Sequence, residues 1–349
     1  MKQAPASLAG LSLSEIEHLL SPLPRLRAKQ IYKWIIRGVC GFNQMTDIPV
    51  SLKKELEERF SVFSSVVESC HEDGGAKKIV LSLKDGAKIE SVLLSDGKKR
   101  LTACLSTQAG CPAHCVFCKT GSLGFKRNLD SSEIIEQFLL LRSGIYAKSS
   151  THIIDNIVIM GMGEPLLNLD QLRKAIAFFT DKSALDFSRR RITVSTCGIC
   201  DGLFELAKNG PFVRLALSLT TADEELRRKL MPIAAANPLQ KVKEALAIFQ
   251  RSGGGRLTLE VPLLGGINTR NIDAKLIADF AKGMDTVVNI IPWNPVAGLE
   301  FEGKPLREPG KKETKDFITL LEKYGLKVTM RLHKGRHIMG ACGQLGAGN

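Results

Sequence analysis

Apolar and polar residues along the chain follow two different periods. From about residue 100 onwards, short apolar or β-branched runs are separated by longer segments in which apolar residues recur every three to four positions. The short runs are typical of buried strands, and the longer segments are typical of amphipathic helices. We predict strands over 101–107, 156–160, 191–195, 213–219, 257–263, 287–291 and 327–332. We predict helices over 133–143, 169–180, 203–208, 239–250, 272–282 and 311–324.

This alternation of strand and helix is repeated about six times and predicts βαβ units with a parallel sheet, an α/β fold. The pattern leaves open whether the sheet is open or closed into a barrel. In both arrangements the reactive groups gather at the C-terminal ends of the strands. The helix over 133–143 also carries a start signal, because Asp130 precedes Glu133 by three positions.

The first 95 residues follow a different pattern, and we predict that they form a domain separate from the core at 96–349. Apolar residues recur at helical spacing in three segments and then alternate in two, around a turn at Asp85 and Gly86. Such a pattern is typical of a small helical domain followed by a β-hairpin. The predicted helices span 11–20, 24–37 and 52–60, and the predicted strands span 78–83 and 88–94.

The composition bounds the class of protein. Of 349 residues, 44% are hydrophobic and 24% are charged, so the chain can bury a sizeable core and is not disordered throughout. No uninterrupted apolar stretch approaches the ~20 residues of a membrane helix, so we expect no membrane span. Acidic residues at Glu15 and Glu17 make the N-terminus unlike a signal peptide. Nine cysteines, an odd number, indicate metal or thiol chemistry in a reducing compartment, the cytoplasm, more than a disulfide scaffold.

The formal charge of +13 favours a polyanionic partner, most simply nucleic acid, although solubility alone would also account for it. Within 24–37, five basic residues have no acid between them and are interleaved with Tyr32 and Trp34. This segment is either a solvated helix face with a core stripe or a surface that follows RNA phosphates. The basic runs 189–191 and 227–229 could extend such a surface. The five basic residues are Arg25, Arg27, Lys29, Lys33 and Arg37.

The strongest chemical signal is a run of three cysteines directly after the first strand of the α/β repeat. Cys111, Cys115 and Cys118 lie within eight residues, so one loop can wrap around a single metal centre. Thiolates suit zinc or iron–sulfur clusters. A structural zinc site needs four ligands, and His114 is a poor fourth ligand because it adjoins Cys115. A 4Fe–4S cluster held by three cysteines would instead leave one iron open to a substrate.

The spacing Cys-x3-Cys-x2-Cys after a first strand resembles the signature of the radical S-adenosylmethionine enzymes. The resemblance implies a partial (β/α)6 barrel over residues 96–349. It also implies a 4Fe–4S cluster whose open iron binds S-adenosylmethionine and whose electron yields a 5′-deoxyadenosyl radical. Gly161-Met-Gly-Glu-Pro165, which follows the second strand, is similar to the superfamily segment that holds the methionyl amino group.

Further polar residues follow later strands at the end that the fold makes reactive. Together with Gly163 and Glu164 they match the cofactor-binding positions of the RlmN/Cfr-like adenosine methyltransferases of ribosomal and transfer RNA. The resemblance covers nearly the whole chain, and Pro165 and Trp293 favour the RlmN branch. Thr220 stands where that branch usually has histidine, and Arg336-His337 replace an acidic pair. The later-strand positions are Ser195, Ser218, Leu219, Thr220 and Asn294.

The resemblance implies methylation of adenosine C2 with two S-adenosylmethionine molecules per turnover. The implied target is adenosine 2503 of 23S ribosomal RNA, with adenosine 37 of transfer RNA as a second candidate. By the same resemblance, Cys342 carries the methyl group as S-methylcysteine, and Cys104 releases the product by forming a transient disulfide with Cys342. Glu90 matches the position of the proton acceptor.

Further implied partners are an electron donor such as flavodoxin and RNA bound by the domain at 1–95, with the protein itself a monomer. Two alternatives remain open at this point: methylation at C8 of adenosine, and a non-catalytic, metal-stabilised RNA-binding protein. Cys197-Gly-Ile-Cys200 is interpreted as packing near Ser195. Arg331, Lys334 and Arg336 could supply a basic environment for the tail cysteine.

Overall fold

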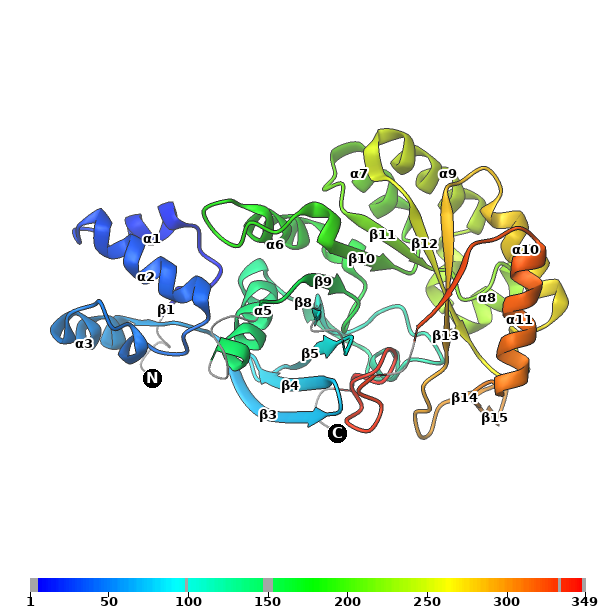
Figure 1. The fold of residues 1–349 in the computed structure, drawn as a ribbon, viewed down its shortest axis with the longest axis horizontal. Helices are drawn as coiled ribbons and strands as arrows, with labels where there is room; N and C mark the ends of the chain where they lie inside the picture. Colours follow the sequence, from blue (N-terminus) through cyan, green and yellow to red (C-terminus); the bar gives the residue numbers. More distant parts are fainter. Residues whose placement is uncertain (1–5, 98–99, 147–152, 332–333, 347–349) are drawn as a thin grey trace.

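The computed structural model describes residues 6–97, 100–146, 153–331 and 334–346. Its main feature is one sheet of ten strands in the order β16-β13-β12-β11-β10-β9-β6-β5-β4-β3. Helices cover the outer side of the curved sheet, and the N-terminal helices lie at the end of the molecule opposite α10 and α11 (Figure 1). No helix in the described ranges is both long and apolar enough to cross a bilayer.

Seven strands of this sheet are parallel, as the pattern of strands and helices predicts, and they form the partial barrel that the resemblance to radical S-adenosylmethionine enzymes implies. Every predicted core strand is confirmed, and Leu332 of the last one lies outside the described residues. The register is longest between β12 and β13, which pair over seven residues. The parallel strands are β6 (Leu101–Leu105), β9 (Asn156–Ile159), β10 (Ile192–Thr196), β11 (Arg214–Ser218), β12 (Leu257–Leu263), β13 (Thr286–Pro292) and β16 (Val328–Met330).

Helices connect successive parallel strands, as a βαβ fold requires. The predicted capping of α5 is confirmed, since Asp130 Oδ1 accepts from the Glu133 N–H at 2.8 Å and Glu133 Oε2 accepts from the Asp130 N–H. All six predicted core helices are present, and α8 is an addition to them. The helices are α5 (Ser131–Tyr146), α6 (Leu169–Thr180), α7 (Cys200–Asn209), α8 (Glu224–Leu230), α9 (Leu239–Phe249), α10 (Asn271–Ala281) and α11 (Lys311–Lys323).

The N-terminal part contains the three predicted helices, and its hairpin has one more strand than predicted. The hairpin strands are antiparallel and continue the barrel sheet through the pairing of β5 with β6. The predicted boundary at residue 95 therefore falls at the last residue of β5, inside a continuous sheet. The elements are β1 (Ala6–Ser7), α1 (Leu13–Leu19), α2 (Arg25–Arg37), α3 (Val50–Arg59), β2 (Phe60–Ser61), β3 (Val66–Asp73), β4 (Ala76–Ser82) and β5 (Lys88–Ser95).

A buried carboxylate joins the N-terminal helices to the core. Glu136 on α5 is 0% exposed and accepts hydrogen bonds from the hydroxyls of Ser7, Ser64 and Ser65, at 2.5–2.9 Å. The backbone N–H groups of Ser64 and Ser65 donate to the same carboxylate. Five donors offset the cost of burying this charge, so these hydrogen bonds fix the position of the N-terminal part relative to the core.

Short elements complete the fold around the cysteine loop and the tail. The described residues of the C-terminal tail, 334–346, contain no helix or strand and lie against the hairpin strands (Figure 1, red). The short elements are β7 (Gln108–Gly110), α4 (Lys119–Ser122), β8 (Phe125–Asn128), β14 (Glu300–Phe301) and β15 (Lys304–Pro305). Single-turn helices lie at Phe42–Gln44, Pro165–Asn168, Arg189–Arg191, Pro232–Ala236 and Gln250–Gly254.

Candidate functional site

The cysteine loop leaves the C-terminal end of β6 and is closed at its base by the pairing of β7 with β8. Gly110, at the turn into the loop, has φ of +76°, and a Cβ there would clash with the carbonyl oxygen of Gly124. The same carbonyl accepts the N–H of Cys111 at 2.9 Å. Only glycine fits this backbone, so the residue before the first cysteine fixes the loop's direction.

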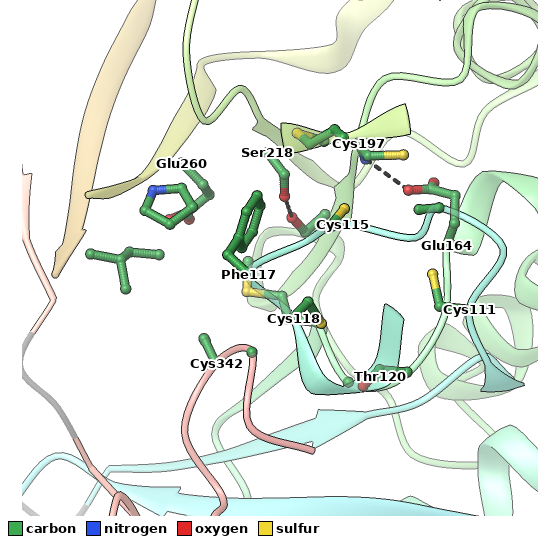
Figure 2. Close-up of a pocket in the computed structure, with 18 of the residues that line it drawn as sticks. Cys111, Cys115, Phe117, Cys118, Thr120, Glu164, Cys197, Ser218, Glu260 and Cys342 are labelled. Carbon is green, nitrogen blue, oxygen red and sulfur yellow. Dashed lines mark hydrogen bonds between the residues drawn. The ribbon is translucent and has the colours of Figure 1, made fainter. Parts of the chain in front are cut away.

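Cys111, Cys115 and Cys118 line one pocket at the C-terminal ends of the parallel strands, as the fold rule requires (Figure 2). The same wall contains Glu164 and Cys342, which lie far from the loop in sequence. Other parts of the wall come from later strands and connections, at Gly163, Ser195, Ser218, Glu260, Asn294 and Arg331. The fold therefore brings together a soft sulfur donor set and polar groups for a ligand.

The sulfur environment fits a thiolate-bound cluster. The Ala113 N–H is directed at Cys111, and those of Thr120 and Gly121 are directed at Cys118, so backbone donors face two of the sulfurs. In the protein alone, burial raises the pKa of the Cys111 thiol to about 12 and that of Cys115 well above its usual value. A positively charged centre would reverse that preference, because it stabilises thiolates. Within the described ranges, no group of three or more His, Cys, Asp or Glu side chains is arranged to hold a single metal ion.

Glu164 is buried between the cysteine loop and β10. Its carboxylate accepts the N–H of Cys197 at 2.7 Å and that of Leu166 at 3.0 Å. Burial raises the pKa of this carboxyl despite these donors. Gly163, beside it, has φ of +106°, and a Cβ there would lie 2.6 Å from the Gln108 side chain. Glycine at position 163 therefore allows this backbone to pack directly against Gln108.

The remaining predicted cofactor positions divide into two groups. Ser195 and Ser218 lie at the ends of adjacent strands, with their hydroxyl oxygens 3.1 Å apart, and both face the pocket (Figure 2). Asn294 also lines it, and its Oδ1 is buried without a hydrogen-bond partner among the described residues. Leu219 and Thr220 are fully buried and are not part of this wall.

The tail that carries Cys342 is attached to the cysteine loop itself. The N–H of Lys119 donates to the carbonyl oxygen of Gly343 at 2.8 Å, and the Thr120 hydroxyl donates to that of Leu345 at 2.7 Å. Asn294 Nδ2 donates to the carbonyl oxygen of Cys342 at 3.0 Å. Cys342 is therefore held at the wall of the pocket that contains the three loop cysteines.

Cys342 also lines a second pocket, which contains Cys104. Arg331 lines both pockets, and its Nη1 lies 3.4 Å from the Cys342 sulfur. Cys342 is the main cause of the raised pKa of Arg331, with a contribution from Glu260. Burial, with a smaller contribution from Cys342, raises the pKa of Cys104 to about 12, and Arg331 opposes the shift.

The other two basic residues predicted near the tail cysteine have different partners. Lys334 donates to the carbonyl oxygen of Ser95. Arg336 pairs with Glu308 at 2.6 Å and lies 3.3 Å from the Trp293 carbonyl oxygen. Arg331 is therefore the member of the predicted trio that contacts Cys342.

Glu90 is on β5, fully buried and not an exposed hairpin carboxylate. It forms an ion pair with Lys78 of β4 at 3.0 Å, and both side chains are at most 5% exposed. Its second oxygen accepts the N–H of Gly346 at 2.7 Å, and Lys78 Nζ lies 3.4 Å from the carbonyl oxygen of Met339. The pair thus contacts the tail on both sides of Cys342.

Three residues at or beside the site were not identified from the sequence. Glu260 lines the pocket from β12 and is 6% exposed, and a glutamate inside the apolar run Leu257–Leu263 was the available signal. Lys78 had no such signal, because lysine in an alternating strand is usually solvated. The run 227–229 was considered as a possible extension of a basic surface, but Arg227 cannot contribute to one, because its side chain on α8 is 0% exposed.

Comparison with known proteins gives the same assignment from two parts of the chain. The Radical SAM superfamily matches residues 105–276, and the ribosomal RNA large subunit methyltransferase N-terminal domain matches residues 7–62. A crystal structure of a radical SAM methyltransferase from Sphaerobacter thermophilus superposes with a TM-score of 0.90 at 32% identity. It covers 98% of this chain and 100% of that one.

Full-length relatives point the same way. A Treponema denticola protein named probable dual-specificity RNA methyltransferase RlmN is 45% identical over 348 residues, covering 99% of this chain and 97% of that protein. A Moorella thermoacetica protein of the same name is 40% identical, covering 97% of this chain and 96% of that protein. The superfamily uses a 4Fe–4S cluster and S-adenosylmethionine, which the donor set described above fits. This chain therefore belongs to the RlmN family of radical S-adenosylmethionine enzymes.

Proposed function

We propose that this protein methylates C2 of adenosine in RNA through a methyl group carried on Cys342. The single observation that carries the proposal is the position of Cys342, which lines the pocket of the three loop cysteines and also the pocket of Cys104. A sulfur shared by two pockets can accept a group on one side and deliver it on the other. The proposed substrates are 23S ribosomal RNA at adenosine 2503 and transfer RNA at adenosine 37.

A carrier is needed because C2 of adenine is a poor nucleophile. It is an sp2 carbon without a usable lone pair, so direct displacement on a sulfonium methyl group would fail there. Cys342 is a competent nucleophile for that displacement as the thiolate. Its sulfur forms the S–CH3 bond while the sulfonium S–CH3 bond breaks, and S-adenosylhomocysteine leaves. Arg331 Nη1 donates to this sulfur at 3.4 Å, which orients the sulfur at the wall of the pocket.

Cys111, Cys115 and Cys118 would hold the 4Fe–4S cluster, with Gly163, Glu164, Ser195, Ser218 and Asn294 around S-adenosylmethionine. When bound, the cluster would supply the electron that cleaves S-adenosylmethionine to a 5′-deoxyadenosyl radical. Removal of a hydrogen atom from the methyl group on Cys342 by this radical would give 5′-deoxyadenosine, and the remaining methylene carbon would form the bond to C2 of adenine. Two S-adenosylmethionine molecules are consumed per turnover, one by Cys342 and one as the radical source. Leu219 and Thr220 support the pocket from the interior, since both are fully buried.

Release of the product requires a base and a second thiol. Glu90 accepts the C2 proton. In this structure its carboxylate oxygens are engaged by the Gly346 N–H and by Lys78, so the Gly346 N–H moves away before the proton is accepted. Cys104 then attacks the Cys342 sulfur. The S–S bond forms as the bond from that sulfur to the methylene carbon breaks. The electron pair of the broken bond stays on the carbon, which takes up a proton, and the unpaired electron left by the addition to C2 would return to the cluster. The products are a disulfide and 2-methyladenosine. Both cysteines line the second pocket, so this pairing needs no large movement of the core.

The test is the identity of the methylated base. Ribosomal and transfer RNA from cells lacking this gene are incubated with the cluster-loaded enzyme, S-adenosylmethionine and a flavodoxin-type electron donor. The RNA is then digested and its methyladenosines are separated. We expect 2-methyladenosine. If 8-methyladenosine alone forms, the proposed position of attack is wrong, and if no methylated base forms, the proposed reaction is wrong.

A further inference from the structure

The helix α8 carries a fully buried arginine next to an exposed one. Arg227 is 0% exposed, whereas the side chain of Arg228 is 51% exposed and pairs with Glu224 at 3.4 Å. A buried charge is costly unless an opposite charge and hydrogen bonds compensate it. Position 227 therefore needs a physical explanation that position 228 does not.

The hydrogen-bond acceptors of Arg227 are neutral. Nη2 donates to the carbonyl oxygen of Cys197 at 2.6 Å, and Nε donates to that of Leu219 at 3.3 Å. Nη1 is buried and has no hydrogen-bond partner among the described residues. Two carbonyls orient the guanidinium but do not neutralise it, and the Glu224 carboxylate acts on it with no hydrogen bond or ion pair between these two described residues. The positive charge therefore remains available to a further anion that is close without touching it.

The charge lies against a residue of the cluster pocket. Arg227 Nη2 contacts the backbone of Cys197, and Cys197 lines the same pocket as the three loop cysteines. The main effect on Arg227 itself is burial, which lowers its pKa, while Cys197 is the largest opposing influence. Cys197 lines the pocket that contains Cys115, and its sulfur lies in the same group of side chains (Figure 2).

A backbone hydrogen bond keeps this charge at a constant distance from the loop. The N–H of Val116, inside the cysteine loop, donates to the carbonyl oxygen of Leu230 at the end of α8 at 3.0 Å. The two carbonyl bonds of Arg227 tie its side chain to the segments that follow β10 and β11. The charge is thus part of a rigid layer directly behind the loop.

We propose that Arg227 is the buried counter-charge of the three-cysteine cluster and raises the reduction potential of that cluster. The proposal rests on the ligand set of the proposed function. A 4Fe–4S core bound by three thiolates has a net negative charge, and reduction adds one more. A fixed positive charge in a poorly solvated layer favours the reduced form, because net charge and exposure are among the factors that set cluster potentials.

The test compares neighbouring arginines on one helix. Full-length Arg227→Met and Arg228→Met are reconstituted with iron and sulfide under anaerobic conditions, and each cluster is titrated with a reductant while its electron paramagnetic resonance signal is followed. We expect a more negative midpoint potential for Arg227→Met than for wild type, and no change for Arg228→Met. An unchanged potential in Arg227→Met would overturn the proposal.

The potential is a property of the loaded molecules, so partial cluster occupancy does not affect the comparison. If Arg227→Met does not fold, Arg227→Lys keeps the charge and Arg227→Gln removes it while retaining a donor for the Cys197 carbonyl. We then expect the cluster of Arg227→Lys to have a midpoint potential near that of wild type and the cluster of Arg227→Gln to have a more negative one. Equal midpoint potentials in the two variants would refute a charge effect. No RNA is present in this experiment, so an error in the proposed methylation chemistry would leave its result unaffected. A Cys115→Ala variant that retains a complete cluster would contradict the ligand set itself.

Discussion

The cysteine loop and the C-terminal tail reach the same pocket by different means. The loop leaves a strand of the central sheet, is closed by the β7–β8 pair, and continues directly into α4. The tail contains no helix or strand within its described residues, 334–346. Its contacts join residues that are 225 and 256 positions apart, Thr120 with Leu345 and Glu90 with Gly346. The loop is positioned by the fold, whereas the tail is positioned by a few individual bonds.

This difference indicates which functions can be separated. A change in the loop should remove the cluster and everything that depends on it. A change at a tail contact should misplace Cys342 while the cluster remains. It also indicates which part can move during catalysis, because a segment held by single bonds opens at lower free-energy cost than a strand connection.

The largest loss of cluster is expected from a substitution at the point where the cysteine loop leaves the sheet. Gly110→Ala places a Cβ against the Gly124 carbonyl at a positive φ, so we expect loss of the cluster, measured as iron and sulfide per chain. Gly86→Ala is the matched control, since Gly86 has φ of +79° with nothing within 4 Å of its Cβ position. We expect it to lose about 1 kcal/mol of unfolding free energy and to keep its cluster. Normal iron content in Gly110→Ala would contradict the account of the loop.

Removing the tail sulfur should separate the two regions. Cys342→Ala is expected to retain wild-type iron and sulfide and to form no methylated adenosine, because the proposed carrier atom is missing. Cys40→Ala removes an exposed cysteine far from both pockets and should leave methylation unchanged. Methylated RNA from Cys342→Ala would show that this sulfur is not the carrier.

Loss of one contact to the tail should slow the S-methylation of Cys342 without abolishing it. Lys78→Met breaks the ion pair with Glu90 and the contact with Met339, and hydrogen bonds to charged groups contribute about 1.5–3 kcal/mol. We expect S-methylation of Cys342 to slow by roughly tenfold or more, since about 1.4 kcal/mol is a factor of ten. Iron content should stay unchanged. Lys77→Met, a change at the adjacent and half-buried lysine, is the control. Wild-type S-methylation in Lys78→Met would mean that the pair does not position the tail.

The smallest expected effect concerns the second thiol. Because the pKa of Cys104 is raised to about 12, it stays protonated between pH 7 and 9, so iodoacetamide should barely label it. Cys40 and Cys70 are exposed to the reagent, so both should be labelled faster than Cys104. Peptide mass spectrometry gives the three rates. Equal labelling of Cys104 and Cys40 at pH 8 would contradict the buried, unreactive resting state.

Much of the fold was predictable because strand and helix periods repeat along the core. The helix Leu169–Thr180 and the strand Leu257–Leu263 were predicted with their observed bounds. The strand Val66–Asp73 was missed because its side chains are mostly exposed at the sheet edge, which leaves no apolar alternation to detect.

The candidate site was predictable where local spacing determines it, as in the cysteine loop. The burial of Glu90 and Arg227 was not predictable, because it depends on segments far away in the sequence, the tail and the end of β10. A charged residue on a strand or short helix looks the same in sequence whether it is solvated or enclosed. The burial of Leu219 and Thr220 behind the pocket wall could not be predicted either, because it also depends on segments far away in the sequence.

The most direct test of the central claim follows a labelled methyl group into the protein. The cluster-loaded enzyme is incubated with methyl-deuterated S-adenosylmethionine without RNA, digested, and analysed by peptide mass spectrometry. The account predicts one deuterated methyl group on the sulfur of Cys342, which is transferred when RNA and reductant are added. Methylated RNA formed without label ever appearing on Cys342 would contradict it.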